Sequence, residues 1–134
     1  MANERNEERG VEVLLGLGAN VDRERNLGRA REMLRARFPA IRFSEPVYTA
    51  PEDFPFPEPF LNQVALLYTD EVPEAVAAAL KRIERAVGRR PEDKARGRVP
   101  IDIDLLCWDG RVLRPGDMAR AYVREGMLGL GKRF

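Results

Sequence analysis

The sequence of 134 residues contains no histidine and a single cysteine, Cys107. The absence of histidine excludes Ser-His and Cys-His nucleophilic pairs, and zinc sites that depend on imidazole. A single thiol also excludes thiolate zinc sites and an internal disulfide, which fits a reducing cytoplasm. Cys107 is predicted to be a buried, unreactive thiol on the same strand face as Ile103 and Leu105. Any catalysis must therefore use carboxylates, arginine or lysine, backbone dipoles and oxygen-bound cations.

The chain also lacks a long apolar run and a strong net charge. No segment approaches the roughly 20 apolar residues that span a membrane, and the N-terminus has no apolar signal-peptide region. The net charge of +1 argues against electrostatic binding of nucleic acid or of a membrane surface. We expect one cytoplasmic domain over residues 1–134 with no nucleic-acid or membrane partner, and a disordered polar tail over residues 1–10.

Apolar periodicity predicts the element order β-α-β-β-α-β. Strands are expected at residues 11–18, 41–49, 60–69 and 101–106, and helices at residues 23–37 and 73–87. An edge position or a bulge is expected in the second strand because Pro46 lies inside it. Four prolines within residues 51–59 predict a stiff, extended loop. Residues 108–134 have no clear period and are predicted to be irregular, with at most one short strand.

This element order is the split pattern of ferredoxin-like α+β folds, in which an antiparallel sheet carries both helices on one face. Because this fold supports many unrelated activities, it does not by itself indicate a function. The function must be argued from particular side chains.

Two aspartates share one face of the last predicted strand. Asp102 and Asp104 alternate with apolar residues, so their Cα atoms should lie about 7 Å apart on the same side. Carboxylates that close repel one another unless cations lie between them. A basic loop precedes them, and its positive residues are Arg89, Arg90, Lys94, Arg96 and Arg98. This combination suggests Mg²⁺ with a polyphosphate, although such alternation is also typical of any strand with one face in water.

The chain resembles the 6-hydroxymethyl-7,8-dihydropterin pyrophosphokinases from about Val13 to Leu106. Five short motifs in order carry the resemblance: Gly18-Ala19-Asn20, Tyr48-Thr49-Ala50-Pro51, Phe60-Leu61-Asn62, Arg82-Ile83-Glu84 and Asp102-Ile103-Asp104-Leu105-Leu106. The resemblance implies an enzyme that transfers diphosphate from ATP to the hydroxymethyl group of the pterin and releases AMP. It also implies two Mg²⁺ ions on Asp102 and Asp104, small-molecule partners only, and a monomer or weak homodimer.

The resemblance further assigns binding residues. The pterin would be bound by Ala50, Pro51, Phe60 and Asn62, with Phe60 stacking on the ring and Asn62 matching its hydrogen-bonding edge. ATP would be bound by Lys81, Glu84, Arg89, Arg96 and Arg98, and Arg98 is also a catalytic candidate.

Three of these assignments have simpler alternatives. Phe60 could be a core residue with Asn62 in solvent. Lys81 and Glu84 could form a surface ion pair between adjacent helical turns. Asn20 could cap the first helix instead of contacting a ligand.

The chain departs from the family pattern in two regions. Val99 stands where the family has an arginine, and Arg98 is taken as its substitute. The histidine and second stacking aromatic of the C-terminal part are not recognisable; Gly126 falls near the expected aromatic, and Tyr122 is taken in its place. Four arginines of this part could reach the triphosphate, and spacing does not select among them: Arg111, Arg114, Arg120 and Arg124. The alternative function is therefore a catalytically impaired paralogue that binds nucleotide or pterin as a regulatory or partner-binding module.

Overall fold

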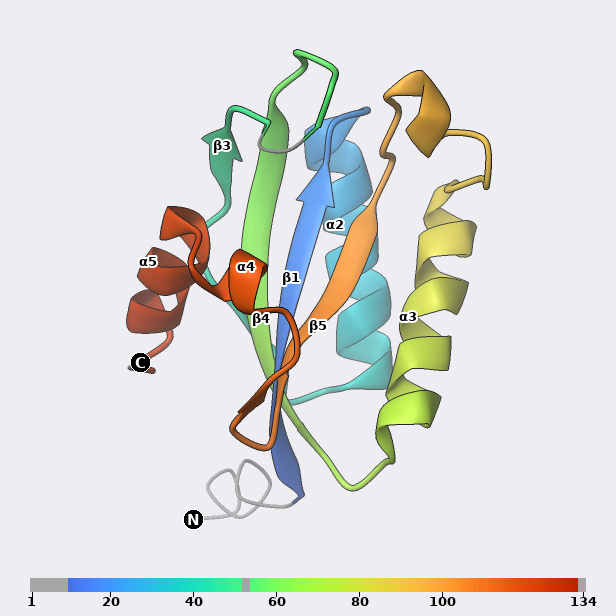
Figure 1. Ribbon diagram of the computed structural model, residues 1–134. Helices are drawn as coiled ribbons and strands as arrows, with labels where there is room; N and C mark the ends of the chain where they lie inside the picture. The colour runs from blue at the N-terminus through green and yellow to red at the C-terminus, as the bar shows by residue number, and fades with distance from the viewer. Residues whose placement is uncertain (1–9, 52–53, 133–134) are drawn as a thin grey trace.

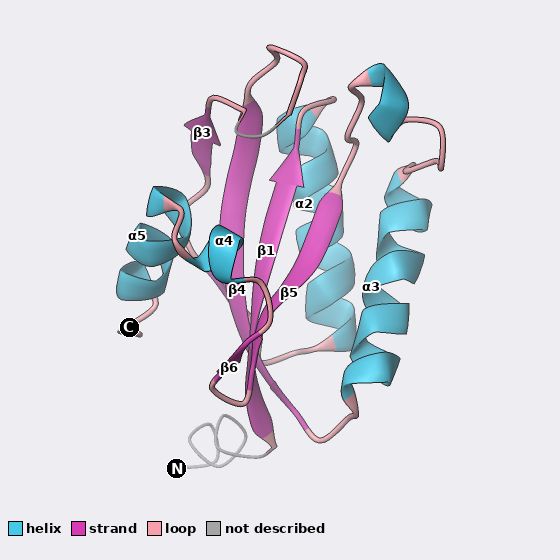
Figure 2. Cartoon of the chain, in the orientation of Figure 1, coloured by secondary structure: helices cyan, strands magenta, loops and turns pink. Residues whose placement is uncertain are grey.

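The computed structural model describes residues 10–51 and 54–132. Apart from Gly10, the tail predicted for residues 1–10 lies outside these residues. The strands are β1 (Val11–Ala19), β2 (Arg42–Phe43), β3 (Val47–Thr49), β4 (Phe60–Thr69), β5 (Asp102–Trp108) and β6 (Arg111–Val112). The helices are α2 (Arg23–Arg37), α3 (Pro73–Val87), α4 (Pro115–Met118), α5 (Ala121–Gly129) and the short 3-10 helix η1 (Lys94–Arg96). Figure 2 shows how these elements alternate along the chain.

The strands form one antiparallel sheet in the order β2-β4-β1-β5-β6, with β3 also paired to β4. Helices α2 and α3 lie side by side on one face of this sheet (Figure 1). Their apolar stripes pack on β1, β4 and β5 to form the main core, with Leu15, Leu17, Leu34 and Leu80 among its buried residues. The predicted ferredoxin-like α+β order, with both predicted helices on one face, is confirmed.

The opposite face of the sheet carries a second apolar cluster, to which α5 contributes Val123 and Met127. Helix α5 approaches β4 so closely that a Cβ atom added at Gly126 would lie 2.4 Å from Cγ2 of Val64. No side chain fits at position 126, which accounts for the missing aromatic there. The prediction that residues 108–134 are irregular is wrong, because packing on this second face stabilises helices whose own period is weak.

Strand pairing corrects two smaller predictions. Residues 41–49 form two short strands instead of one, because Pro46 lies between them and cannot donate a ladder hydrogen bond. In β5 the register with β1 shifts between Leu105 and Cys107, which leaves a β-bulge. Cys107 therefore packs with the second cluster, with its Sγ atom 3.5 Å from Sδ of Met118, and not beside Leu105. Cys107 is half-buried and not fully buried as predicted. Burial still raises the pKa of its thiol, which favours the unreactive protonated form.

Two loops meet at the end of the sheet where β1 finishes and β5 begins (Figure 1). They are the proline loop, residues 50–59, and the basic loop, residues 88–100. The backbone of Gly97 lies directly against the Phe56 ring, since an added Cβ atom would be 2.4 Å from Cγ of that ring. The proline loop therefore rests on the basic loop. Among the described residues, none of the helices has the length and apolar character needed to cross a membrane.

Candidate active site

Two cavities share one wall at this end of the sheet. The first, of about 280 Å³, lies between β1, the proline loop and the C-terminal segment. The second, of about 360 Å³, lies between α3 and the exposed edge of β5. Three of the described residues line both cavities: Asp102, Asp104 and Arg114. The paired aspartates therefore stand at the junction of two adjacent binding spaces.

Asp102 is held in place through α3. Its Oδ1 atom accepts a hydrogen bond of 2.8 Å from Nη1 of Arg89, and the same nitrogen lies 2.9 Å from Oε2 of Glu84. Glu84 is buried, and the same carboxylate oxygen accepts a 2.7 Å hydrogen bond from the backbone N–H of Ile103. Burial raises the pKa of Glu84, while this backbone hydrogen bond and the charge of Arg89 oppose the rise. The alternative of a Lys81–Glu84 surface ion pair is wrong, because Glu84 is buried and pairs with Arg89.

Asp104 has an unusual protonation equilibrium. Burial raises its pKa to about 7, and the neighbouring charge of Asp102 adds to the rise, while Arg114 opposes it. A carboxyl group with this pKa is half protonated near neutral pH because no nearby cation neutralises it fully. The pair therefore favours the arrival of a positive charge.

The donor chemistry of the pair fits Mg²⁺. Two carboxylates are hard oxygen ligands, and Mg²⁺ is commonly held by one or two carboxylates together with waters and substrate phosphates. Within residues 10–51 and 54–132, no group of three or more His, Cys, Asp or Glu side chains could enclose an ion. Asp102 and Asp104 would therefore need waters or substrate phosphates to complete the coordination of an ion.

Asp104→Asn is expected to stabilise the metal-free protein more at high pH than at low pH. The folded-state pKa of Asp104 is about 7, whereas an unfolded aspartate titrates near 3.9. The folded state therefore retains a proton that the unfolded state has lost, and this contribution to stability disappears as the pH rises toward 7. Because asparagine carries no charge to bury, the gain in free energy of unfolding should be about 2 kcal/mol larger near pH 8 than near pH 5.

Urea unfolding in EDTA at these two pH values measures this difference. The exposed Asp109 provides the matched control. Asp109→Asn removes the same charge from a side chain that is not buried. Its change in free energy of unfolding relative to the parent should be the same at both pH values. An Asp104→Asn gain of the same size at pH 5 and pH 8 would contradict the assignment.

The structure brings together the four residues predicted to bind the pterin. Ala50, Pro51, Phe60 and Asn62 all line the first cavity. Asn62 is buried, and its Nδ2 atom donates a hydrogen bond to the Thr49 hydroxyl, which fixes the amide in the wall. The alternative that Asn62 faces solvent is therefore wrong.

An aromatic group borders the same cavity. Phe60 meets Phe54 edge to face, with ring centroids 5.5 Å apart, and Phe54 in turn lies 5.4 Å from the Phe56 ring. Phe54 was not predicted from the sequence, although its place in the proline-rich segment beside a candidate aromatic was a usable signal. Tyr122, taken in place of the missing aromatic, also lines this cavity, and burial raises its pKa to about 12.

Asn20 does not cap α2, and its amide is hydrogen-bonded to the basic loop. Its Nδ2 atom donates to the carbonyl of Gly97 at 2.9 Å, and its Oδ1 atom accepts from the backbone N–H of Val99 at 2.6 Å. Its own backbone N–H donates to the carbonyl of Val99 at 2.9 Å. Asp22 occupies the N-cap position of α2. Asn20 is thus the buried residue that fastens the basic loop to the end of β1.

Comparison with known proteins identifies the family. Residues 14–131 match the family described as 7,8-dihydro-6-hydroxymethylpterin-pyrophosphokinase. The chain belongs to this family. A 2-amino-4-hydroxy-6-hydroxymethyldihydropteridine pyrophosphokinase from two strains of Porphyromonas gingivalis is 40% identical over 103 residues, which cover 70% of this chain and 67% of that protein. The mitochondrial folate synthesis bifunctional protein of Pisum sativum is 39% identical over 100 residues, or 72% of this chain and 19% of that protein.

Among solved structures, a de novo designed protein with a ferredoxin fold matches with a TM-score of 0.32 and 14% identity. The match covers 72% of this chain and 86% of the designed chain. This likeness is too low to bear on the fold, which follows from the strand order alone. Family membership confirms the predicted activity: the protein is a pyrophosphokinase that transfers a pyrophosphoryl group to hydroxymethyldihydropterin, with ATP as co-substrate.

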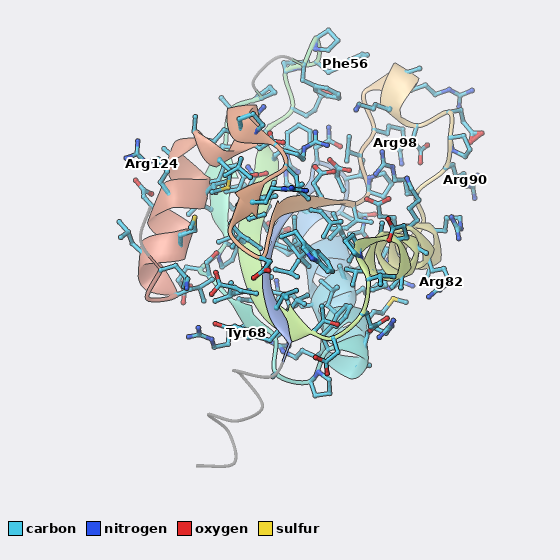
Figure 3. The ribbon with its side chains drawn as sticks, turned by 60° about the horizontal axis from the view of Figure 1, so that its bottom comes forward. Phe56, Tyr68, Arg82, Arg90, Arg98 and Arg124 are labelled. Carbon is cyan, nitrogen blue, oxygen red and sulfur yellow. The ribbon has the colours of Figure 1, made fainter. Side chains whose placement is uncertain are left out.

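The second cavity of this pyrophosphokinase contains part of the predicted ATP site. Lys81, Glu84 and Arg89 line it. Arg96 and Arg98 are exposed and line neither cavity; Figure 3 labels Arg98 on the basic loop. That Arg98 substitutes for the arginine absent at Val99 stays a prediction. Within residues 96–99 of the basic loop, the residue that lines the first cavity is Val99.

The C-terminal segment supplies residues that no sequence pattern selected. Of the four arginines considered for the triphosphate, Arg114 and Arg120 line the first cavity, whereas Arg111 and Arg124 line neither; Arg124 lies on the outer side of α5 (Figure 3). Asp117 joins them in the wall, as does Lys94 of the basic loop. Of Asp117 and Lys94, the sequence pointed only to Lys94, as one of the positive charges of the basic loop. The C-terminal residues could not be placed without knowing that α4 and α5 fold back over the sheet.

Proposed function

We propose that this pyrophosphokinase carries out its reaction where the two cavities meet, and that Asp102 and Asp104 would hold two Mg²⁺ ions there together with the phosphates of ATP. The observation that carries the proposal is that the paired aspartates line both cavities. When bound, the ions would neutralise the charge that spreads over the phosphate oxygens during transfer. The absence of histidine is no obstacle, because phosphoryl transfer depends mainly on positioning and charge neutralisation.

The first cavity is the proposed pterin site. The ring would stack on Phe60, while the amide of Asn62, oriented by Thr49, would hydrogen-bond to the polar edge of the pterin. Backbone groups of Ala50 and Pro51 would complete the wall. The pterin hydroxymethyl group would then face the aspartates, which line the same cavity.

The second cavity is the proposed nucleotide site. Lys81 and Arg89 supply positive charge beside the aspartates, and Arg89 is held by Glu84 at 2.9 Å. The hydroxymethyl oxygen would attack the β-phosphorus of ATP as the bond from this phosphorus to the oxygen of the α-phosphate breaks. The pterin oxygen loses its proton, and AMP is the leaving group. Arg96 and Arg98 are not part of this proposal because they line neither cavity.

The direct test is to incubate the protein with ATP, Mg²⁺ and 6-hydroxymethyl-7,8-dihydropterin and to measure AMP. AMP should form in proportion to pterin consumed, and formation should stop when EDTA is added. Tight nucleotide binding by calorimetry without any AMP at high protein concentration would reject the proposal and favour the catalytically impaired alternative.

Gly18→Ala is expected to weaken pterin binding about fivefold. A Cβ atom at position 18 would lie 2.9 Å from Oδ1 of Asn62, so the amide must shift away from the orientation that Thr49 imposes. An ordered polar group that moves by a fraction of an ångström loses about one hydrogen bond, worth about 1 kcal/mol. Calorimetry with the pterin measures the loss, and Gly129→Ala is the control because nothing lies within 4 Å of an added Cβ atom there. Equal pterin affinities of the two variants would remove Asn62 from the site.

A further inference from the structure

Arg114 lies at the junction of the two cavities, beside the proposed metal ligands. It lines both cavities together with Asp102 and Asp104. It comes from the residue before α4, in the segment for which the sequence showed no period. Any group that passes from the nucleotide cavity to the pterin cavity must therefore pass close to this guanidinium.

The guanidinium of Arg114 has two carboxylate neighbours that it holds unequally. Its Nε atom donates a 2.5 Å hydrogen bond to Oδ2 of Asp117. Its Nη1 atom lies 3.7 Å from Oδ1 of Asp104, which is within ion-pair range but too long for a hydrogen bond. The other oxygen of Asp117 is engaged by Nε of Arg120 at 3.1 Å. Arg114 is thus anchored at Asp117 and only loosely associated with Asp104.

The two aspartates of the pair differ in how closely a cationic side chain approaches them. Asp102 accepts a direct 2.8 Å hydrogen bond from a cation, Arg89, whereas the ion pair of Asp104 with Arg114 is longer, at 3.7 Å. If a divalent cation bound Asp104, it would repel the nearby guanidinium of Arg114 at such short range. Because the stronger bond of Arg114 is to Asp117, the guanidinium can leave Asp104 without leaving the junction.

We propose that Arg114 is a positioning residue that neutralises Asp104 in the metal-free protein and competes with the divalent cation for it. Once the cation binds, Asp117 retains Arg114 at the junction, where its free N–H groups bind the polyphosphate of the nucleotide. This inference rests on the proposed metal-binding role of the aspartate pair. It assigns to Asp117 the function of holding the arginine that the ion displaces.

The test measures binding of Mn²⁺, as a spectroscopic substitute for Mg²⁺, to the nucleotide-free protein by electron paramagnetic resonance. Arg114→Ala should bind Mn²⁺ about five- to tenfold more tightly than the parent, because the competing charge is gone. Arg114→Lys retains the charge and should bind within about twofold of the parent. Arg111→Ala is the matched control, because Arg111 is exposed and lines neither cavity, and its Mn²⁺ affinity should equal that of the parent.

Turnover provides the second measurement. Arg114→Ala should raise the KM for ATP and lower kcat by about tenfold even though it binds the metal more tightly, whereas Arg111→Ala should change neither. Equal Mn²⁺ affinities of Arg114→Ala and the parent would overturn the inference, because a merely structural role would leave metal binding unchanged. Failure of the proposed function is distinguishable: the parent protein would then form no AMP, and Asp102→Asn would not alter Mn²⁺ affinity.

Discussion

Asp102→Asn is expected to lower the rate of AMP formation by a factor of about 10³, the largest loss expected from any single substitution in this protein. The change keeps the shape of the side chain but removes the charge that would hold a divalent ion at the junction of the cavities. Loss of metal stabilisation of the transferring phosphate is worth several kcal/mol in the transition state. Steady-state assays at saturating ATP and pterin measure the change in kcat.

The control for this substitution is Asp109→Asn, which removes an exposed aspartate that follows the same strand. It should leave kcat within about twofold of the parent. Asp102→Asn also weakens the hydrogen bond from Arg89, because a neutral amide oxygen replaces the carboxylate as acceptor. Glu84 still holds that arginine at 2.9 Å, so the fold should survive; circular dichroism checks this. A rate for Asp102→Asn within tenfold of the parent would remove Asp102 from the metal site.

Asn20→Ala is expected to release the basic loop and to cost about 2–4 kcal/mol of stability. The buried amide makes two hydrogen bonds to the loop, to Gly97 and Val99. Its loss leaves the loop's backbone groups without these partners, and each such unsatisfied buried group costs about 1–3 kcal/mol. Because the Phe56 ring rests on Gly97, the proline loop should loosen as well. Urea unfolding measures the stability, and hydrogen exchange measures opening of both loops.

Asn26→Ala separates a local effect from a general one. Asn26 is also buried, and it donates a 2.8 Å hydrogen bond to the carbonyl of Val21, which is not part of the basic loop. This control should lose stability without faster exchange at residues 97–99. If the two variants show the same exchange in that segment, Asn20 does not hold the loop.

The paired aspartates show how much of the site could be predicted from sequence. Alternation along β5 placed Asp102 and Asp104 on one face, and the structure agrees because Ile103 is buried in the main core. The same argument failed three residues later, at Cys107. A bulge opposite Leu14 and Leu15 reverses the alternation there, and such a local change of register leaves no mark in the pattern of apolar residues.

The arginines show the limit of motif comparison. Charge and spacing selected Arg96 and Arg98 for the phosphates, yet both are exposed. Arg89 was selected for the same reason and does line the second cavity. What separates Arg89 from the other two is the path of the basic loop. Asn20 sets this path through hydrogen bonds to Gly97 and Val99, which lie 77 and 79 positions further along the chain.

The sequence by itself determined the order of strands and helices, the apolar faces of α2 and α3, and the pairing of two acids on one strand. These features depend on residues a few positions apart, where periodicity and proline act directly. Only the tertiary structure decided which arginines neutralise those acids, which side of the basic loop faces the cavity, and that a weakly patterned C-terminal segment becomes helical. Those outcomes depend on contacts between distant segments, such as α5 against β4, because packing across the sheet outweighs the local preferences of short elements.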